Sequence, residues 1–391
     1  MAIAHVRSRH IMRILADSNI LFVREAFTHF GHVILSDGRE ITREKLKDID
    51  ILLVRSVTPV GAALLQGTTV KFVASATTGT DHIDLKYLRE NSIGFAHAPG
   101  SNANSVAEYV VSALVHCAGR KGVRIENLTL GIVGVGNIGA RVLSLSRVLG
   151  MRSLLNDPPK RAVTGSDIYL PLKTVLAESD IVTVHVPLVA SGSAATYRMV
   201  NTDFISSMKK GAFLINTSRG DVLDEIDMRE HRKRLGCVAL DVWNNEPAPD
   251  PRTIGVCDLA TPHIAGYSYD GKVRGTEMIY NATCSFFFSE GTWRPPAAVD
   301  GEKPRPIVIK SASDPVAEAV VHAYPILEDD ALFRKICSID ASRRAEFFDE
   351  MRSDYPKRFE FCNYTVAAGK NVPSSAMTLL AGLGFVVSGG E

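Results

Sequence analysis

Three polar side chains that could cooperate in acid–base chemistry each follow a short apolar run. They are Arg219 in N-T-S-R-G, Glu246 in L-D-V-W-N-N-E-P and His263 in T-P-H-I-A-G. An arginine can hold a carboxylate through two parallel hydrogen bonds, and a histidine can exchange a hydroxyl proton as a hydride moves. A carboxylate can orient the imidazole and stabilise its charged form. Each residue alone could be a surface ion pair, a turn or a structural histidine, so the case rests on finding all three together.

A glycine-rich stretch offers a place for a dinucleotide. Gly134, Gly136 and Gly139 form the pattern G-x-G-x-x-G, after an apolar strand expected at 129–133 and before a helical run expected at 140–149. The first glycine permits a tight turn, the second lets the backbone approach a pyrophosphate, and the third allows close packing of helix and strand. The helix N-terminus supplies N–H donors to the phosphates. The alternative is an ordinary glycine turn of an α/β protein.

An acidic residue follows this stretch at the distance that dinucleotide binding requires. Asp157 ends the next expected strand, 18 residues after Gly139, close to the spacing at which an acid holds the ribose diol. An acid there repels a 2′-phosphate, so the sequence favours NAD over NADP. The nearby Lys160 and Arg161 leave NADP open.

The elements that must position these residues alternate between strand and helix throughout two regions. This βαβα rhythm predicts two doubly wound parallel-sheet domains with a cleft between them. Ligands in such sheets bind outside the carboxyl ends of the strands, so we expect the three polar residues to face one crevice. The strands expected are 13–16, 33–35, 51–54, 70–74 and 93–96, then 129–133, 152–156, 181–184, 212–216, 238–241 and 258–260. Helices are expected at 84–90 and at 106–118, the latter capped by Asn104-Ser105.

The two ends of the chain differ from this pattern. The first 11 residues read as an irregular extension without the apolar core of a secretory signal. Proline-rich stretches at 294–296 and 303–306 mark a linker, and the residues after about 305 read as a small α+β module.

Composition excludes several classes of protein. The 391 residues carry a formal net charge of +1, which argues against nucleic-acid binding through bulk charge. No apolar run approaches the ~18 residues that a membrane-spanning helix needs. The six cysteines include no C-x-x-C pair, so we expect reduced, buried thiols in a cytoplasmic protein and no metal site.

Together these motifs resemble the D-2-hydroxyacid dehydrogenase family, from about residue 12 to residue 288. The resemblance implies a Rossmann NAD domain, a flavodoxin-like substrate domain, and catalytic roles for Arg219, Glu246 and His263. It also implies a discontinuous substrate domain made of 1–106 and 270–292. The NAD-binding domain would then be 107–269, followed by a C-terminal dimerisation domain at 293–391 that makes the enzyme a homodimer.

Segments at 53–58, 74–84, 98–110, 156–160, 263–276 and 323–335 resemble one branch of the family more than its phosphoglycerate, lactate or formate dehydrogenases. That branch oxidises 4-phospho-D-erythronate with NAD in pyridoxal phosphate synthesis. The resemblance implies substrate contacts by Ser56, Thr77 and Tyr267. Its implied cofactor contacts are Gly134, Gly136, Asn137, Ile138, Gly139, Asp157, Val186, Ser218, Asp241 and Gly266.

A phosphorylated substrate needs cations for its second anionic group. Arg55, Lys272 and Arg274 are the candidates, with solvated surface charge as the alternative. After S-R-G, residues 221–234 predict a helix that is shorter and more charged than the family's usual one. Two other functions stay open: another 2-hydroxyacid dehydrogenase, such as one acting on 3-phosphoglycerate, and an NAD(H)-sensing, corepressor-like interaction protein.

Overall fold

The computed structural model describes residues 11–296, 304–310, 313–369 and 372–388. The chain divides into two compact units, 1–101 with 271–297 and 102–270 with 298–391. The expected irregular extension lies outside the described residues except for Ile11, and so does part of the proline-rich linker. The division into three domains stays a prediction.

The first unit is built on a five-stranded parallel sheet in the order β2-β1-β3-β4-β5. Its strands are β1 (Met12–Asp17), β2 (Gly31–Ser36), β3 (Ile51–Val54), β4 (Phe72–Ser75) and β5 (Gly94–His97). Alternate residues of β3 enter two separate hydrophobic clusters, as the two-residue period of a strand covered on both faces requires. The helices are α1 (Val23–Phe27), α2 (Ala62–Leu65), α3 (Leu85–Glu90) and the part of α11 (Tyr269–Phe286) from Gly271 onward.

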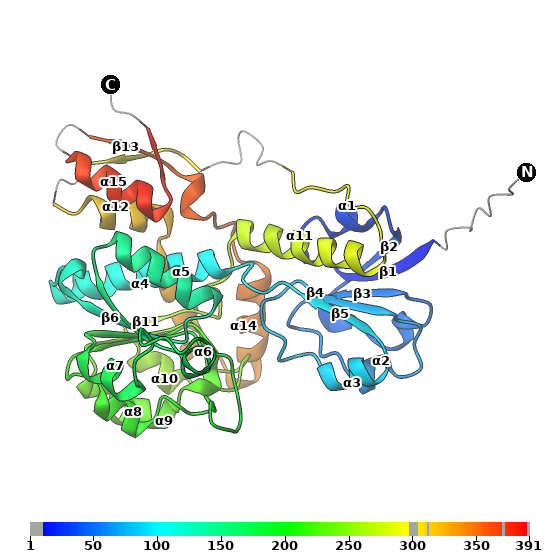
Figure 1. Cartoon of the computed structure of the whole chain (residues 1–391), viewed down its shortest axis with the longest axis horizontal. Helices are drawn as coiled ribbons and strands as arrows, with labels where there is room; N and C mark the ends of the chain where they lie inside the picture. The colour runs from blue at the N-terminus through cyan, green and yellow to red at the C-terminus, as the bar shows by residue number, and fades with distance from the viewer. Residues whose placement is uncertain (1–10, 297–303, 311–312, 370–371, 389–391) are drawn as a thin grey trace, which may run out of the picture. The chain divides into compact units, whose positions relative to one another are not determined.

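The second unit contains a six-stranded parallel sheet in the order β11-β10-β9-β8-β6-β7. The strands are β6 (Thr129–Val133), β7 (Arg152–Asn156), β8 (Ile181–Val184), β9 (Phe213–Asn216), β10 (Cys237–Leu240) and β11 (Leu259–Ala260). In Figure 1, α4 (Ala103–Lys121) and α5 (Asn137–Val148) lie on one side of this sheet. The remaining helices before the C-terminal region are α6 (Pro158–Thr164), α7 (Leu172–Glu178), α8 (Thr202–Ser207), α9 (Glu225–Glu230) and α10 (Pro251–Val256).

The C-terminal region of the second unit adds a three-stranded parallel sheet and four helices. The strands are β12 (Ile307–Ile309), β13 (Thr365–Ala368) and β14 (Val386–Ser388). The helices are α12 (Pro315–Ala323), α13 (Ile326–Phe333), α14 (Arg344–Ser353) and α15 (Ser374–Leu383). Leu380 shares a hydrophobic cluster with α4 and α5, whereas Phe348 shares another with Trp243. This region therefore packs against the six-stranded sheet layer through two separate cores.

The expected architecture of two parallel sheets and a small C-terminal module is confirmed, with strand ends shifted by no more than two residues. None of the helices in the described part of the chain is long and apolar enough to cross a membrane.

Two predictions are wrong. Helix α4 begins at Ala103, so Asn104 and Ser105 lie in its first turn, where both side chains hydrogen-bond to Glu360. Cys117 and Cys237 form a disulfide, whereas reduced thiols were expected. The absence of C-x-x-C pairs is a local criterion, and these two cysteines are 120 residues apart; packing of α4 on β10 brings them together.

Candidate active site

The three polar residues of the expected constellation follow three adjacent strands. Arg219 comes after β9, Glu246 after β10 and His263 after β11, and these strands are neighbours in the sheet. Since the strands are parallel, their carboxyl ends meet at one edge, which is where open α/β sheets bind ligands.

Glu246 and His263 form a direct pair. His263 Nδ1 lies 2.7 Å from Glu246 Oε2, while Glu246 Oε1 accepts a hydrogen bond of 2.9 Å from the Trp243 amide. The His263 side chain is 32% exposed, so the imidazole stays open to a reacting molecule. Burial raises the pKa of Glu246, but the charge and hydrogen bond of His263, the charge of Arg352 and the Trp243 amide outweigh it and lower that pKa. The carboxylate is therefore held ionised beside the imidazole.

The loop that carries His263 is held in a special conformation. His263 has φ of 58°, in the left-handed region that non-glycine residues rarely adopt. The buried Asp241 carboxylate supports this loop, because it accepts bonds of 2.6 Å from the Thr261 hydroxyl, 2.8 Å from the Ile264 amide and 2.9 Å from the Ala265 amide. Burial raises the pKa of Asp241 to about 6 against the lowering effects of His263 and these donors. Backbone strain of this kind persists only where the surroundings determine it, and it concentrates at functional sites.

Arg219 is placed by contacts between the loops after β9 and β10. The Cβ that a side chain would add at Gly220 meets the Trp243 carbonyl oxygen at 1.9 Å, so only glycine allows the two loops to approach. The Arg219 guanidinium donates through Nη1 to the Ser218 carbonyl at 2.7 Å, and the Asn216 side chain donates to the Arg219 carbonyl at 3.1 Å. Glycine at position 220 thus keeps Arg219 next to the loop that bears Glu246.

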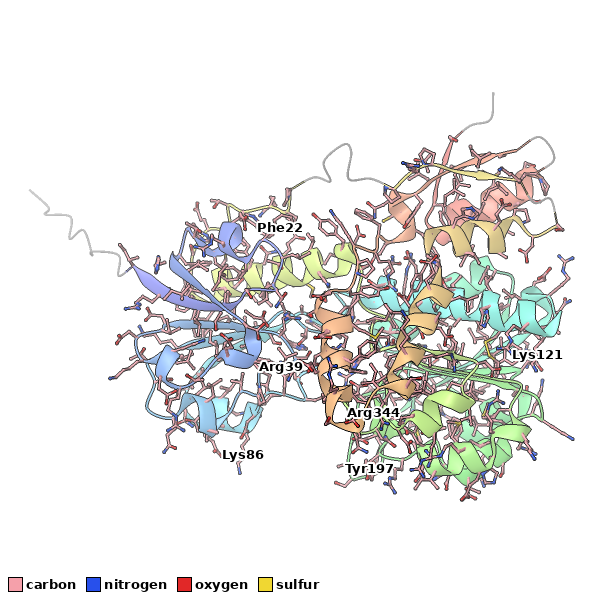
Figure 2. All side chains as sticks on the ribbon, turned by 180° about the vertical axis from the view of Figure 1, so that it is seen from behind. Phe22, Arg39, Lys86, Lys121, Tyr197 and Arg344 are labelled. Atoms are coloured by element: carbon pink, nitrogen blue, oxygen red, sulfur yellow. A yellow bond between two sulfur atoms is a disulfide. The ribbon has the colours of Figure 1, made fainter. Side chains whose placement is uncertain are left out.

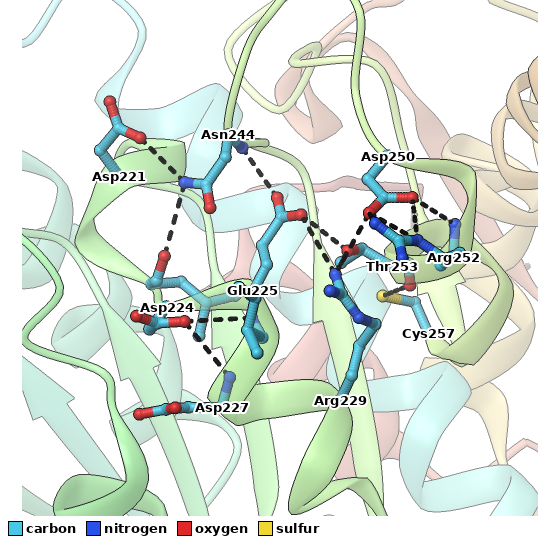
Figure 3. A network of polar contacts seen from close by, with 12 residues as sticks. Asp221, Asp224, Glu225, Asp227, Arg229, Asn244, Asp250, Arg252, Thr253 and Cys257 are labelled. Carbon is cyan, nitrogen blue, oxygen red and sulfur yellow. Dashed lines mark hydrogen bonds and ion pairs between the residues drawn. The ribbon is translucent and has the colours of Figure 1, made fainter.

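A second network supports that loop from the side of α9 (Figure 3). The buried Glu225 carboxylate accepts hydrogen bonds from the Asn244 backbone N–H at 2.8 Å and from the Thr253 hydroxyl at 2.6 Å. The side-chain amide of Asn244 donates to the Asp221 carboxylate at 2.9 Å. Burial raises the pKa of Glu225, with hydrogen bonds from Thr253 and Asn244 opposing it. The sequence predicted that this helix is short and charged but indicated no role for Glu225, because a single buried acid produces no periodic signal.

The glycine-rich loop fits a dinucleotide. Gly134 has φ of 87°, and a Cβ on Gly139 would lie 2.0 Å from the Gly134 carbonyl oxygen, so turn and helix are in close contact. A Cβ on Gly136 would meet nothing within 4 Å among the described residues, which leaves open space directly before α5. Asn137 and Ile138 are the first two residues of that helix, where N–H groups lack intrahelical partners.

Asp157 and Lys160 both hydrogen-bond to the backbone of the glycine-rich loop. Asp157 Oδ2 accepts from the Val135 amide at 2.9 Å and Oδ1 accepts from the Lys160 amide at 3.0 Å, which caps α6. The Lys160 ammonium donates to the Val135 carbonyl. A lysine engaged in this way is turned to the loop itself, which weakens the sequence argument that it could receive a 2′-phosphate.

The remaining residues expected at the cofactor lie on adjoining loops of the same unit. A Cβ on Gly134 would meet the Val186 side chain at 2.8 Å, so Val186 lines the glycine loop. Ser218 is buried and donates to Asn216, and Gly266 packs against Asn102, whose side chain a Cβ would meet at 2.2 Å. Asp241 and Val186 are thus placed by protein contacts in the structure, and their contacts with a cofactor stay predictions.

The residues expected to bind substrate are divided between the two units. Tyr267 is in the second unit, four residues after His263; Ser56, Thr77, Arg55, Lys272 and Arg274 are in the first. Arg55 forms a 3.0 Å ion pair with the fully buried Asp17, and Arg274 donates to the Ser101 carbonyl at 2.9 Å. Thr77 contacts the Ser75 hydroxyl at 2.7 Å, Ser56 is exposed, and Lys272 lies on α11 two residues before Arg274. Arg55 therefore has a structural partner, which the sequence did not reveal.

Two family models and several full-length relatives match this chain. Residues 105–265 match the model of the D-isomer specific 2-hydroxyacid dehydrogenase NAD binding domain, and residues 309–384 match a domain of unknown function. The chain is 48% identical to an erythronate-4-phosphate dehydrogenase of Salinibacter ruber, covering 93% of this chain and 95% of that protein. It is 41% identical to the enzyme of the same name from Azotobacter vinelandii, covering 93% and 96%.

Solved structures with the same fold cover about 71% of the chain. D-lactate dehydrogenase from Aquifex aeolicus, complexed with NAD and lactic acid, is 25% identical, with a TM-score of 0.59 over 71% of this chain and 95% of that one. An NAD⁺-bound 3-phosphoglycerate dehydrogenase from Entamoeba histolytica has a TM-score of 0.61 at 24% identity over 71% and 96%.

Proposed function

Because the chain belongs to the D-2-hydroxyacid dehydrogenase family, in which it is an NAD-binding oxidoreductase, we propose that it oxidises 4-phospho-D-erythronate. The product is 2-oxo-3-hydroxy-4-phosphobutanoate, and Arg219, Glu246 and His263 are the proposed catalytic residues. The observation that carries the proposal is the 2.7 Å contact between the ionised Glu246 carboxylate and the partly exposed His263 imidazole. The names of the full-length relatives support the substrate.

The glycine loop and the start of α5 are the residues that would hold the dinucleotide. Gly136 would let the backbone approach a pyrophosphate, and the N–H groups of Asn137 and Ile138, at the start of α5, would be its donors. Asp157, at the end of β7, is the predicted partner of the ribose diol. NAD, when bound, supplies the acceptor for the hydride.

Proton transfer is the task of His263. An ionised carboxylate can only accept, so Nδ1 carries the proton shared with Glu246; in the neutral imidazole, Nε2 is then the nitrogen with the lone pair that a base needs. As the C2–H bond breaks with its electron pair, Nε2 takes the proton of the C2 hydroxyl and the C2–O bond becomes a carbonyl. Glu246 then faces an imidazolium, whose positive charge it stabilises.

The two anionic ends of the substrate need different residues. Arg219 is the proposed anchor of the carboxylate, because a guanidinium matches its two oxygens. Ser56, Thr77 and Tyr267 stay the predicted hydroxyl partners. Lys272 and Arg274 stay the predicted phosphate cations, and Arg55 is the weakest of the three because its charge is already paired with buried Asp17.

We also propose a cytoplasmic homodimer assembled through residues 293–391. The C-terminal region exposes several large apolar side chains, among them Val308 at 53%, Val321 at 52%, Leu327 at 49% and Val386 at 51%. Exposed apolar side chains favour association with a second copy where they form a contiguous surface.

NADH formation by the purified chain tests the proposed function. We expect 4-phospho-D-erythronate to give a kcat/KM at least about a hundredfold above that of 3-phosphoglycerate, because the latter lacks one hydroxyl-bearing carbon and so cannot reach the carboxylate anchor and the predicted phosphate cations at the same spacing. Equal or better turnover of 3-phosphoglycerate would reassign the substrate. NADH binding without turnover of either acid would favour a nucleotide-sensing protein.

A further inference from the structure

The C-terminal region contacts the loop that bears His263. Within the second unit, the Arg358 guanidinium donates to the Ala265 carbonyl at 2.6 Å, and the Tyr269 amide donates to the Arg358 carbonyl at 2.7 Å. The Ser268 hydroxyl donates to the Glu360 carboxylate at 3.1 Å. Both contacting residues lie within the 309–384 segment that matches a domain of unknown function. This segment therefore hydrogen-bonds to the loop that carries His263.

Arg352, near the end of α14, contacts Tyr267 in the same loop; Arg344, labelled in Figure 2, marks where that helix begins. Arg352 Nη2 donates to the Tyr267 hydroxyl at 2.8 Å. The guanidinium carbon of Arg352 lies 5.4 Å from the centre of the Tyr267 ring and 5.6 Å from the centre of the Phe348 ring. Two aromatic rings and one hydrogen bond thus fix the guanidinium. Its Nε is buried and has no hydrogen-bond partner among the described residues.

The same guanidinium acts on Glu246. Among the described residues, His263, from the loop after β11, and Arg352, from α14, both lower the pKa of Glu246 through their charge, against the effect of its burial. Arg352 in turn is faced by Tyr267 and Glu246, and by Asp349 on its own helix. A guanidinium keeps its positive charge at every pH at which the protein is folded, so its effect on Glu246 does not depend on pH.

We propose that Arg352 is a positioning residue of the Glu246–His263 pair: it fixes Tyr267 in the His263 loop and holds a permanent positive charge toward Glu246. This inference rests on the proposed function, in which that pair moves the proton. It assigns a role in the reaction to the C-terminal segment, which otherwise reads as a separate module.

Three variants separate charge from packing. Arg352→Gln removes the charge, Arg352→Lys retains it without the planar group, and Arg343→Met removes an exposed arginine just before α14 as the matched control. We expect the acid limb of the pH profile of kcat/KM to move up by roughly half to one pH unit in Arg352→Gln, because the acid–base pair loses a neighbouring positive charge. The limb should stay at the wild-type position in Arg352→Lys and Arg343→Met.

A direct titration keeps the test independent of turnover. The Glu246 carboxyl, followed by carbon-13 NMR of glutamate-labelled protein and assigned with Glu246→Gln, should titrate at higher pH in Arg352→Gln even if the substrate assignment fails. Should Arg352→Gln not fold, Arg352→Met takes its place, since its chain keeps the packing on Phe348. An unmoved Glu246 titration in a folded variant, or an equal shift in Arg352→Lys, would overturn the proposal. A wild-type chain that oxidises no phosphorylated acid, with the titration shift present, would refute the proposed function alone.

Discussion

Two arginines that the sequence presents as anion ligands are held in different ways. Arg55, after β3 in the first unit, forms an ion pair with Asp17, whose side chain is fully buried. Arg219, after β9 in the second unit, is placed by the glycine at 220 and donates to the backbone carbonyl of Ser218. Both follow strands of parallel sheets, and both would read as surface charge in isolation.

The difference lies in what each side chain stabilises. A buried carboxylate such as Asp17 needs its partner, since removing one member of such a pair leaves an uncompensated charge in a low-dielectric interior. The Arg219 guanidinium contacts the Ser218 backbone carbonyl, and we propose that its charge serves a ligand. The same residue type therefore supports folding in one unit and, as proposed, binding in the other.

The largest effect is expected from Arg219→Gln. Two charge-assisted hydrogen bonds to a carboxylate are each worth about 1.5–3 kcal/mol, so kcat/KM should fall by roughly a hundredfold to ten-thousandfold. The melting temperature should change little. Arg152→Gln, at an exposed pair with Glu178, is the matched control. Wild-type kcat/KM in steady-state assays of Arg219→Gln would remove its proposed role.

The opposite pattern is expected of Arg55→Gln. Leaving Asp17 buried without its partner should lower the free energy of unfolding by about 3–5 kcal/mol, while folded molecules retain most of their activity. Thermal unfolding and active-site-normalised kinetics measure the two quantities. An unchanged melting temperature with a strongly raised KM would restore Arg55 as a phosphate ligand.

Asp241→Asn tests how much the Asp241 carboxylate stabilises the loop that carries His263. Burial raises the pKa of Asp241 to about 6, above its unfolded value, so between about pH 4 and 6 the folded chain binds more protons than the unfolded chain. The contribution of this group to the free energy of unfolding is therefore present at low pH and lost as pH rises through 6. Asn does not titrate, so the slope of the free energy of unfolding against pH, measured by denaturant unfolding across this window, should be more positive than in the wild type.

In the same experiment, Asp167→Asn is the control, since its side chain is 97% exposed. We also expect Asp241→Asn to cost roughly 1–3 kcal/mol at neutral pH, because three donors lose a charged acceptor. A slope equal to that of the wild type would show that Asp241 is ionised throughout the window.

The smallest effect is expected from Asp157→Ser. The acid disfavours a 2′-phosphate, so its removal should lower the preference for NAD over NADP by about tenfold in kcat/KM. Asp167→Ser tests whether loss of any nearby acid has the same effect. A preference that stays unchanged would mean that the contacts of Asp157 with Val135 and Lys160 are its whole role.

Local patterns made much of this predictable. Strands β3, β6 and β8 were expected at the observed bounds because buried parallel strands are continuous apolar runs. The glycine pattern predicted the helix that follows β6, although α5 begins at Asn137, three residues before the expected 140. Glu246 and His263 were expected at one edge because both follow adjacent strands, and the structure brings them to 2.7 Å.

Contacts between distant parts of the chain were not predictable. The Cys117–Cys237 disulfide, the Arg55–Asp17 ion pair and the approach of Arg352 to Tyr267 join residues 120, 38 and 85 positions apart. No spacing rule covers such pairs, because they depend on how helices pack on sheets. The hydrogen bond from the Asn244 backbone N–H to Glu225, which supports the loop of Glu246, was not predicted for the same reason.

The central claim is that His263, held by Glu246, accepts the substrate proton. Turnover of 4-phospho-D-erythronate by His263→Gln, with NADH affinity titrated on the same sample, tests it most directly. The account predicts a loss of kcat of about a hundredfold to ten-thousandfold with NADH affinity unchanged. Near-normal turnover in a variant that binds NADH normally would contradict it.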